Sequence, residues 1–191
     1  MKRTATANWT KSLTEGSGTL DTLSGALQAL PYTHKGRFVD ETGQSGTNPE
    51  ELIAAAHSGC FAMQLAHFLA ENGTPATNLK VEAAVTLVPG TGITGSALTL
   101  VGTVPDIDEA KFQELAEKAK VNCPVSKALG AIDITLEGEL PHEPVAAWTQ
   151  EDPPFPPRSI EPFECRVQLV EVFEDVENDL IARLCLDKLN E

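Results

Sequence analysis

The chain has 191 residues, of which 41% are hydrophobic, and a formal net charge of −14, a composition typical of a globular protein rather than a disordered one. Because nucleic acids and anionic membrane surfaces attract Lys and Arg, the acidic excess argues against both as partners. There is no run of eighteen apolar residues and no apolar segment behind the basic N-terminus, so the sequence predicts neither a membrane span nor a secretory signal, and we expect a cytoplasmic protein.

The N-terminal part predicts short strands. Asn8–Thr10 and Gly18–Leu23 have strand character, and the turn Glu15–Gly18 between them is typical of a hairpin. A loop containing Pro31 follows, and then a short strand around Arg37–Val39 is predicted.

The strongest helix signal begins at Asn48. This residue is suited to cap a helix, Pro49 to its first position and Glu51 to a capping box. Gly73 is a C-terminal stop signal, so we predict a helix that ends at about Asn72. Its interior is apolar nearly all round, which predicts burial on most sides.

The remaining elements form a strand pair, a helix, a helical turn and a last strand. An Asp at 106 or 108 is the expected cap of the helix. This order of elements predicts an α+β fold with largely antiparallel pairing. The predicted ranges are Leu79–Val88, Ile93–Val104, Ile107–Val121, Val125–Leu129 and Ile132–Leu140.

Composition changes near residue 140. Residues 1–140 carry 10 basic and 16 acidic residues and all 14 glycines, whereas residues 141–191 carry 4 basic and 12 acidic residues and 7 of the 13 prolines. We therefore predict a domain over residues 1–140. A stiff Pro-rich linker from Pro141 to Pro162 and an acidic C-terminal extension of unknown role follow, over residues 141–191. Cys165 and Cys185 in this extension are expected to be buried or incidental.

Four cysteines are too few for a disulfide scaffold in a chain of this length, so they are expected to be catalytic, metal-binding or buried. Cys60 lies in mid-helix, where a small buried hydrophobic side chain is the ordinary interpretation. The helix dipole fades after the first turn, so a reactive thiolate at Cys60 needs a cation from elsewhere in the fold. Cys123, at a helix exit before Pro124, is on its own also interpreted as structural.

Two other kinds of site, a zinc site and a glutaredoxin-type motif, share some of these residues. His57 and Cys60 share a helix face and, with Cys123 and another histidine, could bind zinc. Cys-x2-Cys and His-x3-His spacings are absent, however, so we expect no metal. Residues 123–126 have the Cys-Pro-x-Ser pattern of glutaredoxins, but they follow a helix near the end of the domain instead of a strand near its start.

Two longer segments are more specific. Residues 46–61 (GTNPEELIAAAHSGCF) and 122–129 (NCPVSKAL) resemble the osmotically inducible protein C and organic hydroperoxide resistance (OsmC/Ohr) family. Gly36-Arg37-Phe38 is similar to the position of the arginine in the OsmC branch. His57 is also similar to that branch, since the Ohr branch tends to have a tyrosine there. The resemblance covers roughly residues 3–140, in order and without large gaps.

The resemblance implies a cysteine-based peroxidase that reduces organic hydroperoxides to alcohols. Cys60 would be the peroxidatic thiol and Cys123 the resolving thiol that forms a disulfide with it, while Arg37 and Glu50 would hold the thiolate. The implied fold is an intertwined homodimer with antiparallel sheets wrapped around long central helices, here with an extra C-terminal segment. The implied reductant is a dithiol, with lipoylated proteins suggested for the family, and we expect no cofactor.

The physical chemistry of the residues adds two expectations. The apolar neighbours Leu52, Ile53 and Phe61, with His57, are expected to line the substrate site and to favour an alkyl peroxide. Glu50 and Cys60 are ten residues apart on one helix, or about 15 Å along its axis, too far for one arginine to reach both easily. We therefore expect the site to be shared across the dimer interface. The partner would supply Glu50 alone or both Glu50 and Arg37. The alternative is a non-catalytic module of this fold that binds a partner through its acidic tail.

Overall fold

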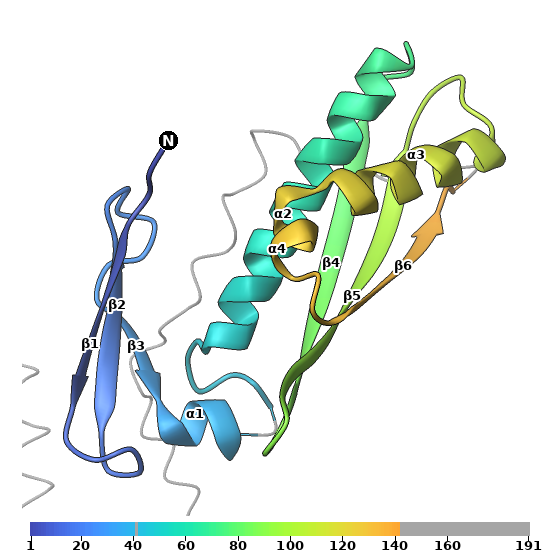
Figure 1. Cartoon of the computed structure of the whole chain (residues 1–191). Coiled ribbons are helices and arrows are strands. Elements are labelled where there is room, and N and C mark those ends of the chain that lie inside the picture. The colour runs from blue at the N-terminus through green and yellow to red at the C-terminus, as the bar shows by residue number, and fades with distance from the viewer. Residues whose placement is uncertain (41, 142–191) are drawn as a thin grey trace, which may run out of the picture. The chain divides into compact units, whose positions relative to one another are not determined.

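The computed structural model describes residues 1–40 and 42–141. In chain order these residues form three strands, two helices, two strands, two helices and a last strand, which confirms the α+β class (Figure 1). The linker and extension predicted for residues 141–191 lie outside the described residues, except for Pro141.

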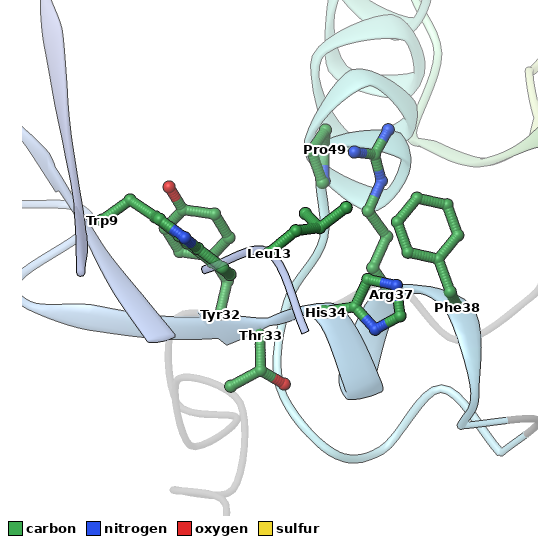
Figure 2. A pocket seen from close by; sticks show the side chains of 8 residues that line it. All are labelled: Trp9, Leu13, Tyr32, Thr33, His34, Arg37, Phe38 and Pro49. Atoms are coloured by element: carbon green, nitrogen blue, oxygen red, sulfur yellow. The ribbon is translucent and has the colours of Figure 1, made fainter. Parts of the chain in front are cut away.

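The first sheet is an antiparallel hairpin extended by a third strand, and the predicted hairpin is confirmed. Trp9 and Tyr32 come from the two outer strands, and their rings lie against each other with centroids 5.1 Å apart (Figure 2). Gly18 pairs with both residues, and a Cβ there would collide with the Tyr32 ring, so glycine permits this contact. The sheet has the order β1-β2-β3, with β1 at Ala5–Thr10, β2 at Ser17–Thr22 and β3 at Leu30–Thr33.

Two predictions in the next segment are wrong. The expected loop around Pro31 is strand β3, and the expected strand around Arg37–Val39 is helix α1 (His34–Phe38). Proline fits β3 because β3 is an edge strand of its sheet. The helix forms because the Thr33 hydroxyl accepts the amide of Gly36 at 3.0 Å, and this cap outweighs the strand preference of Phe and Val.

The long helix α2 (Pro49–Glu71) begins and ends as predicted. The Asn48 side chain accepts the amide of Glu51 at 2.8 Å. The capping box is replaced by another contact, in which the Glu51 carboxylate accepts the hydroxyl of Thr47 at 2.7 Å. Gly73, just past the end, has φ of 81°, a left-handed conformation that favours glycine.

The second sheet has the order β4-β5-β6. The hairpin of β4 and β5 is antiparallel, as predicted, but β5 and β6 are parallel, so the expectation of antiparallel sheets is wrong for this pair. The reason is the connection: two helices carry the chain back before β6, and such a crossover gives parallel neighbours. The elements are β4 (Asn78–Val88), β5 (Gly92–Thr103), α3 (Glu109–Asn122), α4 (Pro124–Ala128) and β6 (Asp133–Glu139).

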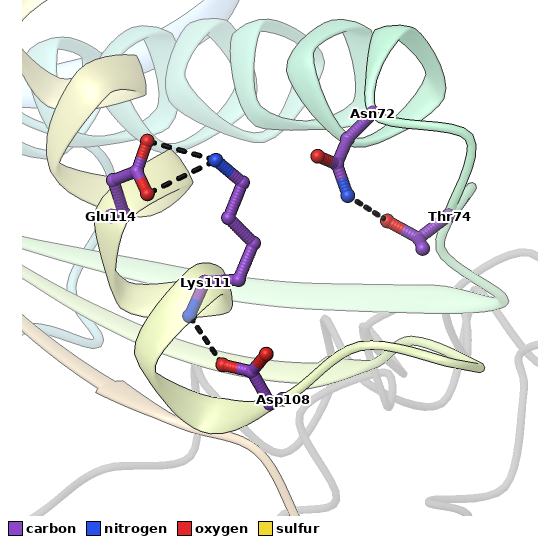
Figure 3. Close-up of polar contacts among 5 residues, drawn as sticks. All are labelled: Asn72, Thr74, Asp108, Lys111 and Glu114. Atoms are coloured by element: carbon purple, nitrogen blue, oxygen red, sulfur yellow. Dashed lines mark hydrogen bonds and ion pairs between the residues drawn. The ribbon is translucent and has the colours of Figure 1, made fainter.

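Helix α3 is fixed at its start by local polar contacts. Of the two candidate caps, Asp108 is the one used: its carboxylate accepts the amide of Lys111 at 2.8 Å, and the Lys111 ammonium lies 2.9 Å from Glu114 (Figure 3). The Asn72 side chain donates to the Thr74 hydroxyl at 3.1 Å just after α2. Of these exposed contacts, the Lys111–Glu114 ion pair contributes little to stability, whereas the cap at Asp108 defines the start of the helix.

The core lies between one face of α2, strand β5 and helix α3. Gly102 of β5 touches the Phe112 ring so closely that a Cβ would not fit. By length and composition α2 could also cross a membrane, but these contacts make it the central helix of the described domain. The largest apolar side chains that are completely or almost completely buried are Phe61, Leu65, Leu69, Leu98, Leu100 and Phe112.

The opposite face of α2 is a stripe of small and apolar residues, which we call the α2 stripe. The expectation that α2 is buried on most sides is wrong for the single chain, because the described elements cover only one of its faces. Met63 in this stripe is 77% exposed. The stripe consists of Leu52, Ala56, Gly59, Met63, Ala66 and Ala70, and all but the half-buried Leu52 are exposed.

Candidate active site

The structure brings together the two thiols that the sequence singled out. Cys60 lies in the middle of α2 and is half-buried, and Cys123 is completely buried at the junction of α3 and α4. Both are free cysteines. Cys60 packs against the core cluster that contains Cys123, and each thiol shifts the pKa of the other. Two neighbouring thiols are the arrangement that disulfide formation requires.

The surroundings of the two thiols favour a negative charge on Cys123. Burial raises the pKa of Cys123. Four neighbouring groups more than offset burial and hold this pKa below its usual value: the amide of Ser126, the Cys60 thiol, the Ser126 hydroxyl and the amide of Val125. The Cys60 thiol belongs to α2 and the other three groups to the first turn of α4, where the Cys123 side chain makes no capping hydrogen bond.

Burial and the neighbouring Cys123 thiol raise the pKa of Cys60, and the amide of Val125 opposes them only in part. No cation of the described residues is among the groups that shift this pKa. The activation of Cys60 by a guanidinium, expected from the sequence, is therefore absent from the described part of one chain. Beside the Cys60 sulfur lies a hollow of about 260 Å³ that Met63, Gln64, His67 and Pro124 also line.

Arg37 and Glu50 form the second half of the candidate site. The Arg37 guanidinium donates two hydrogen bonds to the Glu50 carboxylate, from Nε at 3.1 Å and from Nη2 at 2.7 Å. The side chain of Glu50 is only 10% exposed, whereas that of Arg37 is 34% exposed. Such a bidentate pair holds the guanidinium in one orientation.

An aromatic hollow of about 270 Å³ lies beside this ion pair (Figure 2). The Arg37 guanidinium lies 4.8 Å from the centroid of the Phe38 ring. The hollow thus combines a cation with an apolar wall that could hold an alkyl group. Its lining consists of Trp9, Leu13, Tyr32, Thr33, His34, Arg37, Phe38 and Pro49.

The arrangement of one chain separates these two halves. Glu50 is in the first turn of α2, about 15 Å along the helix axis from Cys60. Arg37 pairs with Glu50 of its own chain, while the groups acting on the Cys60 sulfur are Cys123 and the Val125 amide. One chain therefore carries a thiol pair and an oriented guanidinium at different levels of the same helix.

Comparison with known proteins agrees with the two sequence segments. A family model described as "OsmC-like protein" matches residues 42–137. Peroxiredoxin OsmC of Escherichia coli (strain K12) is 43% identical over 137 residues, which cover 70% of this chain and 93% of that protein.

The chain belongs to the OsmC/Ohr family. The organic hydroperoxide resistance protein OhrB of Bacillus subtilis is 39% identical over 98 residues, covering 50% of this chain and 71% of that protein. Its crystal structure aligns with a TM-score of 0.53 and 30% identity, covering 71% of this chain and 98% of that one. An OsmC-like protein from Mycoplasma pneumoniae, at 14% identity and a TM-score of 0.58, covers 74% and 99% of the two chains and supports the fold alone.

The side chains predicted to bind substrate in this OsmC/Ohr chain differ in exposure. His57 is completely buried, with Ser96 Oγ 2.8 Å from Nδ1 and Ser126 Oγ 2.9 Å from Nε2. Phe61 is in the core, and Leu52 and Ile53 are half-buried. In the single chain, His57 and Phe61 therefore offer no surface to a substrate.

Ser96 and Ser126 of this OsmC/Ohr chain were not among the site residues predicted from the sequence. Ser126 belongs to the segment that carries the family resemblance, so its place three residues after Cys123 was a signal that could have drawn attention to it. Ser96 is one serine in an alternating strand, and no pattern distinguishes it from the other polar residues of β5.

Proposed function

We propose that this chain reduces organic hydroperoxides to alcohols, with Cys60 as the attacking thiol and Cys123 as the resolving thiol. The chain is a thiol peroxidase of the OsmC/Ohr type, and its relatives bear the names peroxiredoxin and organic hydroperoxide resistance protein. The observation that carries the proposal is the proximity of the half-buried Cys60 thiol to the completely buried Cys123 thiol.

The reaction has two steps at these sulfurs. The Cys60 thiolate attacks the terminal peroxide oxygen, the O–O bond breaks, and an alkoxide leaves and is protonated to the alcohol. Cys60 is then a sulfenic acid, which condenses with Cys123 to give a disulfide and water. A guanidinium beside Cys60 would lower its pKa and stabilise the leaving alkoxide, and an arginine is suited to this role because it stays charged in apolar surroundings.

That guanidinium is proposed to be Arg37 of a partner copy, held by the partner's Glu50. The α2 stripe supports a homodimer, because small residues let two helices approach closely and an apolar face of this length favours burial. An antiparallel pair of α2 helices that crosses near Ala55 and Ala56, which are both exposed, brings Glu50 of one chain opposite Cys60 of the other. The aromatic hollow beside Arg37 would then supply an apolar wall for the alkyl group of the peroxide.

The remaining parts of the proposal follow from the sequence. The disulfide is reduced by a dithiol, for which a lipoylated protein is the candidate, and the reaction takes place in the cytoplasm without a metal or other cofactor. The negative charge of the chain supports the view that neither nucleic acid nor membrane is a partner.

Single cysteine substitutions test this function. Cys60→Ser is expected to abolish consumption of cumene hydroperoxide, whereas Cys123→Ser keeps the first oxidation and loses recycling. The double substitution Cys165→Ser and Cys185→Ser is the matched control and keeps full turnover. Mass spectrometry of the oxidised wild type should find a Cys60–Cys123 disulfide. A wild type that consumes no peroxide and forms no such disulfide would favour a non-catalytic binding module instead.

A further inference from the structure

We propose that Ser126 and His57 form a buried proton relay that takes the proton of the Cys123 thiol when the disulfide forms. This inference rests on the proposed function, because it concerns the second of its two chemical steps. Ser126 acts on the reacting sulfur, and His57 acts through Ser126 without touching either cysteine.

The relay is a continuous chain of polar groups from three elements. Ser126 is the third residue of α4, the helix that begins directly after Cys123, and its hydroxyl is one of the groups that lower the pKa of Cys123. The same hydroxyl lies 2.9 Å from His57 Nε2 on α2, and His57 Nδ1 lies 2.8 Å from the hydroxyl of Ser96 on β5. Both ring nitrogens therefore have a partner, and one of these partners leads directly to the resolving thiol.

Burial makes such a relay necessary. Cys123 and His57 are 0% exposed, Ser96 is 1% and Ser126 is 6% exposed. Bulk water therefore does not reach the Cys123 thiol in this chain, and a buried thiol loses its proton only to a group within hydrogen-bond reach. Among the described residues, His57 is the base that forms a hydrogen bond with Ser126, three residues after this thiol.

The hydrogen bonds allow one consistent direction of transfer. With the His57 proton on Nδ1 donating to Ser96, Nε2 accepts from the Ser126 hydroxyl, and the Ser126 oxygen accepts from the Cys123 thiol. Transfer along this chain leaves a Cys123 thiolate and an imidazolium. Ser96, on the other side of the ring, has a hydroxyl that accepts from Nδ1–H in this arrangement and can equally donate, so it does not fix the tautomer.

The step balances in atoms and electrons. The Cys123 thiolate attacks the sulfur of the Cys60 sulfenic acid, the S–S bond forms, and the S–O bond breaks with its electron pair on the leaving hydroxide. The proton returns from His57 through Ser126 and joins the hydroxide, so that one water is released and His57 is neutral again. No further oxidant or reductant takes part.

The electrostatics around His57 fit a transient acceptor. Burial lowers the pKa of His57 below its usual value, so the ring is neutral and able to accept at neutral pH, and an imidazolium releases its proton readily. Burial alone shifts the pKa of His57, and no charged group of the described residues contributes to the shift. On the surrounding elements, the buried Glu50 pairs with Arg37 and Lys120 is half-buried. Lys80, Glu82, Lys127 and Asp133 are exposed.

The test separates proton transfer from simple support of the fold. Reduced full-length wild type is mixed with one equivalent of cumene hydroperoxide. Sulfenic acid is trapped with dimedone, and the disulfide is followed by mass spectrometry, both between pH 6 and pH 9. The variants are His57→Gln and Ser126→Ala. Glutamine can still form a hydrogen bond to Ser126, but its amide does not accept a proton as an imidazole does. Ser96→Ala is the matched control, because it removes the other hydrogen bond of the same buried ring.

We expect His57→Gln and Ser126→Ala to form sulfenic acid at the wild-type rate but the disulfide about 100-fold more slowly, the lower end of what a positioned acid–base group contributes. Their disulfide rates should rise with pH, as hydroxide replaces the relay, while the wild-type rate is flatter. Ser96→Ala should stay within about threefold of wild type, since it leaves the path from Cys123 to His57 intact.

Two results overturn the relay alone: disulfide formation in His57→Gln at the wild-type rate and pH profile, or equal slowing in Ser96→Ala and Ser126→Ala, which indicates a structural role. If one variant fails to fold, the other still decides. A wild-type chain that forms no Cys60–Cys123 disulfide overturns both this inference and the proposed function.

Discussion

The first turn of α2 and its middle carry opposite kinds of chemistry. At the first turn, Glu50 and Arg37 form a bidentate ion pair beside an aromatic hollow, and the arginine is partly open to solvent. Near the middle, Cys60 meets Cys123 and a buried hydrogen-bonded histidine, and burial raises the pKa of Cys60. The Cys60 thiol lacks a cation that would lower its pKa, and the Arg37 guanidinium is such a cation in a region without a thiol. Each region therefore supplies a group that the other lacks.

This difference explains why a single chain is an incomplete enzyme in the proposed account. The ion pair is rigid because both carboxylate oxygens of Glu50 are used. The α2 stripe between and beyond the two regions is the surface through which a second copy would bring them together. The predictions below address first the cation, then the stripe and then the buried histidine.

Replacement of Arg37 is expected to have the largest effect. Arg37→Ala should lower kcat/KM for cumene hydroperoxide about 100- to 1,000-fold, because a positioned cation stabilises both the thiolate and the leaving alkoxide. Arg37→Lys should recover only part of this, since lysine keeps the charge and loses the bidentate pair. Alkylation of Cys60 by iodoacetamide as a function of pH should show a higher thiol pKa in both variants. An unchanged alkylation profile in Arg37→Ala would contradict the role of Arg37.

A charge placed in the α2 stripe should break the homodimer. Met63→Glu buries a carboxylate in an apolar interface, and we expect dimer dissociation to become at least about 100-fold easier. Sedimentation over a range of concentrations measures this. Val121→Glu is the matched control: Val121 is 64% exposed on α3 and should leave the dimer intact. If both variants stay dimeric like wild type, another surface forms the interface.

The buried histidine should give a smaller effect, visible in the dependence of stability on pH. Because burial lowers the folded pKa of His57 below the usual 6.5, the unfolded chain binds a proton that the folded chain does not. The free energy of unfolding should therefore decrease as pH falls below about 6.5. Urea unfolding at pH 7.5 and 5.5 should show a smaller decrease for His57→Gln than for wild type. His67→Gln, at an exposed position of the same helix, should behave as wild type, and equal decreases in all three proteins would argue against a buried neutral His57.

The sequence predicted those elements whose signals are local. The cap at Asn48, the turn before Gly92 and the start of α3 are each decided by a few neighbouring residues. The structure has the first two as predicted, and it uses Asp108, one of the two predicted caps, to begin α3. The helix α1 was missed because its cap, Thr33, competes with two strand-forming residues. The parallel β6 depends on where two helices return the chain, which no short pattern encodes.

In the candidate site, too, residues with local sequence signals were predicted and residues that depend on tertiary packing were not. Cys60 and Cys123 were found because each lies in a long characteristic segment, and the structure places their thiols near each other. Ser96 was missed because its role depends on β5 packing against α2, 39 residues away in sequence. The exposed face of α2 was also unexpected, since the composition of a helix indicates that it is apolar but not whether its own chain covers it.

The most direct test of the central claim is a heterodimer of two inactive chains. Arg37→Ala and Cys60→Ser chains carrying different affinity tags are co-expressed, and the mixed dimer is isolated through both tags. If Arg37 serves the Cys60 of the partner, this dimer has one complete site of two and should show about half of the wild-type peroxidase activity, as a two-fold symmetric assembly requires. If Arg37 serves Cys60 of its own chain, the mixed dimer contains no complete site and is as inactive as its parents, which would contradict the account.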